Sequence, residues 1–164
     1  MFEIGDYVLN ATNGICKISE IVELDMSGDK QLKSYFLLRP VEEENDTVYI
    51  PVDNADKRIR KVITQDEALA VLDRVPEIEA LAVNNEKERE TRYKEAVRSC
   101  EPDSVISLLK CLHIRNEQRA QAGKKSTAVD ERYGKMAEHN LNAELAFVLE
   151  KDKQEIKDII HDML

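Results

Sequence analysis

The residue types that carry catalysis or bind metals are present in this chain, but their spacing matches no chemical signature. Three cysteines and three histidines lie apart, without a C-x-x-C pair or a spacing typical of metal ligands: Cys16, Cys100, Cys111, His113, His139 and His161. Buried thiols are therefore favoured over a disulfide framework or a zinc site. No nucleophile signature and no glycine-rich phosphate loop is present. We expect no enzymatic activity, no metal, no cofactor and no small-molecule substrate.

The acidic run "EEEND", residues 42–46, has side chains of the type that bind cations. It lacks the glycine and the ligand spacing of a calcium-binding loop. We interpret it as a solvated hairpin loop whose charge also discourages pairing at a neighbouring sheet edge.

The charge distribution singles out one segment. The 164 residues carry a net charge of −9, which argues against nucleic acid as a partner. Residues 84–125, in contrast, hold 10 basic and 7 acidic side chains. Because Lys and Arg contact phosphate oxygens, this basic island is the candidate DNA-contacting region. The candidate residues are Lys87, Arg89, Arg92, Lys94, Arg98, Lys124 and Lys125.

The first part of the basic island, "EKERETRYKEAVRS" at residues 86–99, is expected to be a helix capped by Asn84 or Asn85. At about 100° per residue, its side chains fall on two stripes. One stripe is basic and contains Lys87, Lys94 and Arg98. The other contains Arg89, Tyr93 and Val97. We expect the second stripe to pack inward at its C-terminal end, which leaves Arg89 exposed near the helix start.

An ordinary solvated face is the alternative for this helix. Glu88–Arg92 and Glu90–Lys94 have the i,i+4 spacing and orientation that stabilise any surface helix. A DNA-binding patch further requires that later basic residues lie close to the helix in space: Lys110, Arg115, Arg119, Lys124 and Lys125. Both alternatives remain open on the residues alone.

Residues 1–63 have the period of β-strands. Short apolar runs are separated by the turn formers Asn13-Gly14 and Ser27-Gly28-Asp29. Pro51 must lie at an edge or a strand end, because it has no N–H to donate to a ladder. Five short strands with almost no helix signal predict a small open β-barrel. Such a barrel is too small to enclose a substrate cavity, which favours a binding module.

From Ile63-Thr64 onward the period changes to that of helices, so the fold class is α+β, with a barrel over residues 1–63 and an all-helical domain over residues 64–164. Thr64 with Glu67, and Thr127 with Asp130, have the spacing of capping boxes. Pro76 is expected to start a short helix, and Pro102 another. The first helix is expected to bury Ala68, Leu69, Leu72 and Val75. A later stripe is formed by Val105, Leu108, Leu109 and Leu112.

The cellular compartment is suggested by two absences in the sequence. No apolar stretch approaches the roughly 18 residues that span a bilayer. The N-terminal "MFEIGDYVLN" lacks the regions of a signal peptide. A cytoplasmic protein without a membrane partner is expected.

The order of these elements, with particular sequence words in each, resembles the CarD family of bacterial transcription regulators. "IGDYVLNATNGICKISEI" is similar to the family's opening, and "VYIPVDNADKRIRKVI" to its strand ending in Pro and the last strand. "RYKEAVRSCEPDSVISLLKCLHIRNEQR" and "STAVDERYGKMAEHNLNAELA" are similar to its two main C-terminal helices. The barrel is shared with the polymerase-interacting domain of transcription-repair coupling factor.

The resemblance implies a Tudor-like (SH3-like) barrel that docks on the β subunit of bacterial RNA polymerase. It further implies a helical domain near promoter DNA that influences open-complex formation, and no enzymatic activity. The polymerase contacts carried over from the family fall on Val48, Tyr49, Ile50 and Pro51. An exposed barrel edge can accept a partner strand through main-chain hydrogen bonds, which is physically consistent with this location.

Three positions depart from the family. Asn10-Ala11 stands where many members have Tyr-Pro, and Tyr49 where a basic residue serves the polymerase. Arg89 stands where the family has a tryptophan wedge, and the chain contains no Trp. Since Arg contacts phosphates or a narrow minor groove but cannot unstack a base step, weak DNA contact is expected. The alternative is a protein–protein adaptor of the same fold without a DNA role.

Overall fold

The computed structural model describes residues 1–164 and divides the chain into two compact units, residues 1–62 and 63–164. This division falls one residue before the boundary expected from the sequence. The first unit contains all the strands and the second contains five α-helices, so the α+β fold class is confirmed.

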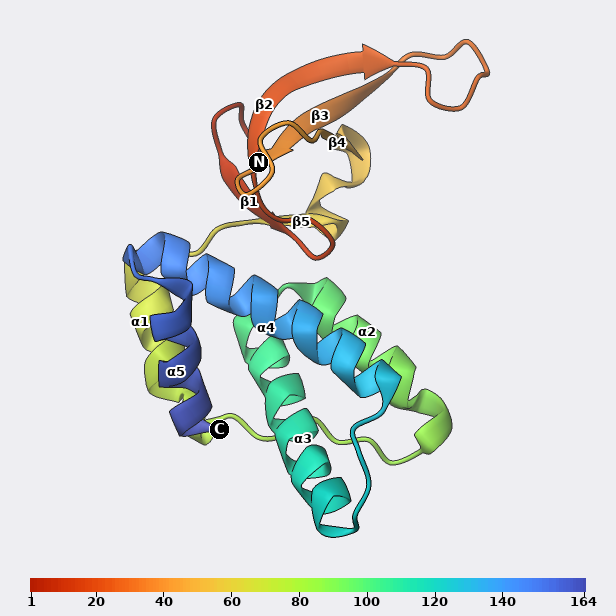
Figure 1. Ribbon diagram of the computed structural model, residues 1–164. Coiled ribbons are helices and arrows are strands. Elements are labelled where there is room, and N and C mark those ends of the chain that lie inside the picture. The colour runs from red at the N-terminus through yellow and green to blue at the C-terminus, as the bar shows by residue number, and fades with distance from the viewer. The chain divides into compact units, whose positions relative to one another are not determined.

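The N-terminal unit is a five-stranded antiparallel sheet (Figure 1). Its elements are β1 (Tyr7–Asn10), β2 (Gly14–Leu24), β3 (Lys33–Pro40), β4 (Val48–Pro51), the 3-10 helix η1 (Val52–Lys57) and β5 (Ile59–Lys61). The strand order is β4-β3-β2-β1-β5, so β4 and β5 are the two edges and do not pair with each other. The sheet is therefore open, and backbone pairing does not close it into a barrel.

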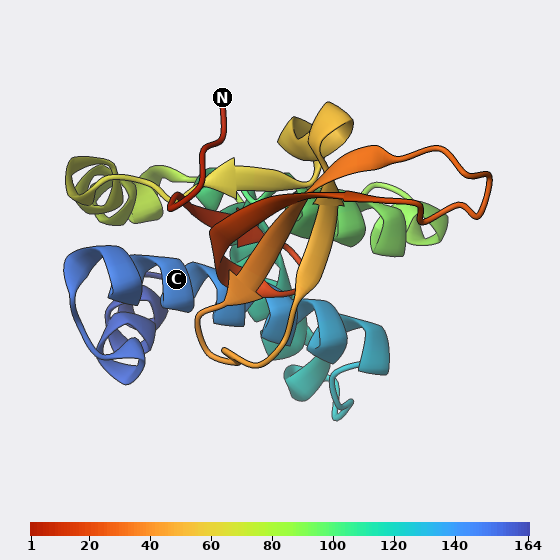
Figure 2. The ribbon, with the colours of Figure 1, turned by 90° about the horizontal axis from the view of Figure 1, so that it is seen from above.

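A tight turn after β1 and a longer loop after β2 lie at the two places where the sequence predicts turns. Between β1 and β2, the Asn10 side-chain oxygen accepts hydrogen bonds from the backbone N–H groups of Thr12 and Asn13, both at 3.0 Å. Gly14 follows with a φ of 72°, a conformation that a residue with a Cβ rarely adopts. The β2–β3 hairpin continues past the rest of the sheet, and Figure 2 shows its orange loop extending outward.

One face of this sheet carries the core of the N-terminal unit. Its members are apolar side chains from all five strands and from η1: Val8, Cys16, Ile18, Phe36, Leu38, Ile50, Ala55 and Ile59. Burial raises the pKa of the Cys16 thiol to about 11, so this cysteine is a neutral, packed side chain. Cys16 and Cys100 are buried thiols as expected, whereas Cys111 is only half-buried.

The C-terminal unit is built around its longest helix. The elements are α1 (Gln65–Arg74), η2 (Val75–Glu77), η3 (Glu86–Glu88), α2 (Arg89–Ser99), α3 (Pro102–Gln121), α4 (Ala128–Leu149) and α5 (Lys153–Met163). The α4 helix contacts α1, α2, α3 and α5, and α2 also packs on α3 (Figure 1). No helix is both long enough and apolar enough to cross a membrane.

The two predicted capping boxes have different outcomes. Thr64 and Glu67 form both reciprocal hydrogen bonds, at 3.0 and 3.1 Å, and start α1 as predicted. Thr127 accepts from the backbone N–H of Asp130 at 3.1 Å, but the Asp130 carboxylate does not return to Thr127. The second prediction is therefore half correct, because Asp130 has other partners.

The segment after α1 differs from the prediction. Pro76 lies in the single 3-10 turn η2, and the chain then runs without helix to residue 85. The Lys110 ammonium donates to the carbonyls of Val75 and Ile78, the latter at 2.6 Å. Leu81 N–H donates to Ser107 O at 2.9 Å. Because these tertiary hydrogen bonds occupy groups that a continuing helix would use, the predicted short helix does not form.

The predicted buried stripe of α1 is also partly wrong. Leu69 is 52% exposed, whereas Val71 is buried together with Ala68. Leu69 and Val71 lie about 200° apart around the helix, so burial of Val71 turns Leu69 to solvent.

Candidate functional site

The Arg89 side chain folds back onto its own unit. Its Nε and Nη2 donate to the two carboxylate oxygens of Glu86 at 2.9 and 2.6 Å. Its Nη1 donates to the Tyr93 hydroxyl at 2.9 Å. Only 15% of the side chain is exposed, so the prediction of an exposed Arg89 at the end of the stripe is wrong. The guanidinium also lowers the pKa of Glu86 through these hydrogen bonds.

Tyr93 links Arg89 to a buried carboxylate in the interior of the helical unit. The residue is fully buried, and its hydroxyl donates to Asp130 Oδ1 at 3.0 Å. Burial raises the pKa of Tyr93 to about 12, so the phenol is neutral. Its ring meets Tyr133 edge-to-face, with centroids 6.0 Å apart. Tyr93 therefore fixes α2 on α4.

Asp130, on α4, is the last residue in this series of contacts. Its counter-ion is Arg115 on α3. The Asp130 carboxylate is 1% exposed, and Arg115 Nε donates to its Oδ2 at 2.7 Å. Arg115 also lies 3.8 Å from the Glu86 carboxylate. These five side chains, which we call the Arg89 network, connect η3, α2, α3 and α4: Glu86, Arg89, Tyr93, Arg115 and Asp130.

The Arg89 network and Lys110 remove three cations from the predicted DNA-binding surface. Arg89 and Arg115 are paired with buried or nearby carboxylates, and Lys110 binds main-chain carbonyls. Arg119 donates to the carbonyl of Lys125 at 2.8 Å, which holds the loop after α3. Several basic residues of the island therefore hold the helical unit together instead of adding positive charge to its surface.

The remaining candidate cations are exposed but do not share one face. Lys94 and Arg98 lie one turn apart on α2, and Lys87 precedes them in η3. Arg92 lies about 200° from Lys94 around the helix and lines a cleft with Glu95 and Asp103. Lys124 and Lys125 lie in the loop at the far end of α3 (Figure 1). The structure therefore groups Lys94 and Arg98 on one side of α2, and Lys87 lies in the turn before that helix.

The β4 edge is the second candidate site. β4 pairs with β3 on one side, with Leu38 opposite Val48 and Tyr35 opposite Pro51, and its other side has no partner strand. Tyr49 is 38% exposed, whereas Ile50 is 4% exposed and packs in the core. Val48 is half-buried against the same core, and Pro51 ends the strand. Of the four candidate residues, Tyr49 has the most exposed side chain, and Ile50 offers a partner only its backbone.

The comparison with protein families concerns this N-terminal unit. Residues 2–63 match the family model of the CarD-like/TRCF RID domain. The N-terminal unit is a CarD-like/TRCF RID domain. No curated protein matches the chain at a significant level. The RID domain match suggests a transcription-related protein and implies an interaction with RNA polymerase.

The match ends where the helical unit begins, so it says nothing of α1 to α5. No group of three or more His, Cys, Asp or Glu side chains in the protein is arranged to hold a metal ion. Sequence spacing does not reveal the Arg89 network as a whole, because Asp130 lies 15 positions from Arg115 and 37 from Tyr93. The local signals of direct contact are the i,i+3 spacing of Glu86 and Arg89 and the i,i+4 spacing of Arg89 and Tyr93.

Proposed function

We propose that the chain is a non-enzymatic bacterial transcription regulator that docks on the RNA polymerase β subunit through the β4 edge of its RID domain. The observation that carries this proposal is the free β4 edge with the exposed Tyr49, in a unit that matches the RID family. We take the twisted open sheet as the functional equivalent of a Tudor-like barrel.

Strand addition is the binding mode that the edge supports best. A partner strand beside β4 gains main-chain hydrogen bonds, while alternate side chains determine specificity. Ile50, anchored in the core, keeps the strand in place during binding. Tyr49 lies on the opposite face and contributes an aromatic contact, a common anchor at interfaces.

The docking proposal is tested by a pull-down of the full chain with the polymerase β subunit. Tyr49→Ala is expected to weaken binding by about tenfold, the usual effect of removing an aromatic anchor. Tyr7→Ala is the matched control, since Tyr7 is 39% exposed on β1 of the same sheet. Equal binding by both variants and the original chain would remove Tyr49 from the interface.

A weak DNA contact by the helical unit is the second part of the proposal. The exposed cations Lys94 and Arg98 on α2, with Lys87 in the preceding turn, support contact with phosphates, which carries little sequence specificity. Docking on the polymerase would supply the high local concentration that such a weak contact needs. Through this contact the protein would modulate open-complex formation at promoters.

The rival function is a protein–protein adaptor without a DNA role. It is favoured by the net charge of −9 and by the internal use of Arg89, Lys110 and Arg115. The double variant Lys94→Ala/Arg98→Ala separates the two, because an adaptor keeps its full effect on transcription whereas a promoter-acting regulator loses it. Tyr49→Ala abolishes the effect in both cases.

A further inference from the structure

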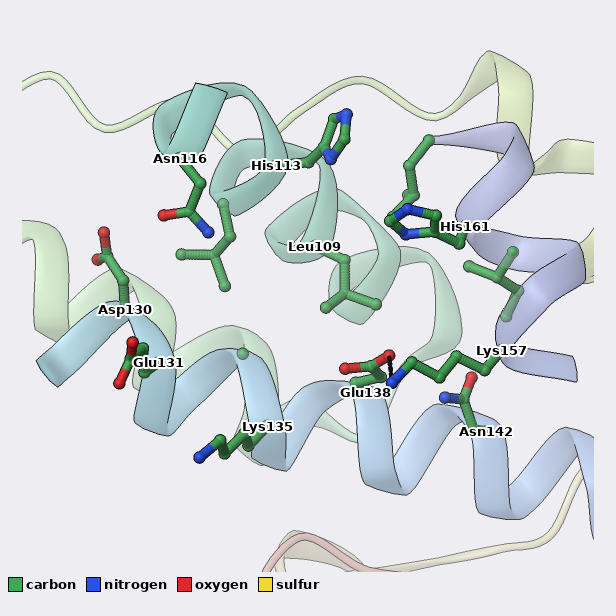
Figure 3. Close-up of a pocket in the computed structure, with 14 residues that line it drawn as sticks. Leu109, His113, Asn116, Asp130, Glu131, Lys135, Glu138, Asn142, Lys157 and His161 are labelled. Carbon is green, nitrogen blue, oxygen red and sulfur yellow. Dashed lines mark ion pairs between the residues drawn. The ribbon is translucent and has the colours of Figure 1, made fainter. Parts of the chain in front are cut away.

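A cleft in the helical unit lies between α3, α4 and α5 and has a volume of about 340 Å³ (Figure 3). This volume is at the lower end of the range of small-molecule sites. Its floor is apolar and consists of Leu109, Leu112, Ile160 and Leu164. Gly134 lies in the second turn of α4, where a Cβ would be 3.2 Å from Leu112 Cδ1. The glycine thus lets α3 and α4 approach closely beneath the cleft.

Asn142 is the observation that points to a ligand. The residue lines the cleft and is only 7% exposed. Its amide forms no hydrogen bond with another group of the protein. No fully enclosed side-chain N or O atom of the protein lacks a partner, so the amide atoms of Asn142 are open to water, and the cleft is the space that this residue lines. A ligand with a matching polar edge would replace that water without leaving the amide unpaired.

Two imidazole rings form part of the wall of the cleft. His113 on α3 and His161 on α5 meet edge-to-face, with centroids 6.0 Å apart and an interplanar angle of 89°. Figure 3 shows both rings on the side of the cleft opposite α4. His113 Nε2 lies 3.3 Å from Glu117 Oε1. Such rings offer flat surfaces against which a planar ligand can pack.

The charged side chains of the cleft disfavour an anionic ligand. Asp130 is held in the Arg89 network, and Glu131 accepts from the Ser126 hydroxyl at 2.7 Å. Glu138 pairs with Lys157 at 3.4 Å across the cleft from α4 to α5. Arg115 neutralises Asp130, so Glu131 and Glu138 are balanced by Lys135 and Lys157, and the lining has no excess of positive charge. A neutral ligand fits this balance better than a carboxylate or a phosphate.

We propose that this cleft binds the base of a purine nucleoside as a ligand, not as a substrate. The Asn142 amide offers a donor and an acceptor side by side, the pattern with which Asn pairs with the N6 and N7 edge of adenine. The apolar floor accommodates the ring, and the histidine pair packs against it. The proposal concerns the helical unit alone and does not depend on polymerase docking.

The test is a titration of the full chain with adenosine, followed by amide NMR spectra. The expected result is a saturable set of shifts confined to α3, α4 and α5. Asn142→Asp keeps the side-chain shape but loses the donor, and it is expected to weaken binding about tenfold. Asn84→Asp, the same change at an exposed position outside the cleft, is expected to leave binding unchanged.

A second variant and a second probe keep the test decisive. If Asn142→Asp unfolds the helical unit, His161→Ala at the exposed rim is expected to weaken adenosine binding in a folded protein. Benzoate, an aromatic anion without the donor and acceptor edge, is expected not to bind. Absence of saturable adenosine shifts, or equal binding of benzoate, would overturn the proposal.

Discussion

The Tyr93 hydroxyl donates to the buried carboxylate of Asp130 at 3.0 Å, and this hydrogen bond fastens the basic helix α2 to α4. Arg89 joins the same hydroxyl from the other side. The Arg89 side chain therefore points inward and helps to hold α2 against α4.

Tyr93→Phe is expected to destabilise the protein by about 1–3 kcal/mol, since Asp130 loses one buried donor and Arg89 loses an acceptor. Urea unfolding of the full chain measures this change. Tyr133→Phe is the matched control, because the Tyr133 hydroxyl meets the exposed Glu90 carboxylate at 3.2 Å, and a smaller loss is expected. Equal losses for both variants would contradict the importance of the buried bond.

The stability of the protein is expected to fall between pH 10 and pH 12 because of Tyr93. Burial raises the pKa of Tyr93 from 10 to about 12, so the folded state favours the neutral phenol. The stabilisation is fully present below pH 10 and is lost as the pH rises towards 12, up to about 3 kcal/mol. The stability difference between the original chain and Tyr93→Phe isolates this effect, since Cys16 titrates in both. A difference that stays constant over this pH range would contradict it.

Arg89→Ala is expected to lower stability while leaving DNA affinity nearly unchanged. The substitution breaks hydrogen bonds to the exposed Glu86 carboxylate, which solvent screens, and one to the hydroxyl of the buried Tyr93, which accounts for most of the expected loss. Lys94→Ala/Arg98→Ala removes exposed cations and is expected to reduce the salt dependence of binding by about two phosphate contacts. Gel shifts with fork-junction DNA over a salt series measure both. A reduced salt slope for Arg89→Ala would show that Arg89 contacts phosphate after all.

Local patterns predicted those elements that local hydrogen bonds determine. The Asn13-Gly14 turn, the start of α1 at Thr64 and the break at Pro102 all depend on groups within a few residues. Five strands were predicted by alternation, and five strands form the sheet.

Long-range contacts explain most of the differences. Lys110, on α3, donates hydrogen bonds to the carbonyls of Val75 and Ile78. Arg115 binds the Asp130 carboxylate, which therefore does not bond back to Thr127 at the start of α4. No periodicity in the sequence indicates such pairs. The same limit applies to the β4 edge, where alternation separates Tyr49 from Ile50 but cannot say which strand lies at the edge of the sheet.

Hydrogen exchange of the β4 amides tests the central claim most directly. The full chain is mixed with the isolated lobe of the polymerase β subunit, and exchange is compared with that of the free chain. Docking by strand addition predicts slower exchange at β4, Val48–Pro51, with the amides of β5 at the opposite edge unchanged. Binding without protection of β4, or no binding at all, would contradict the account.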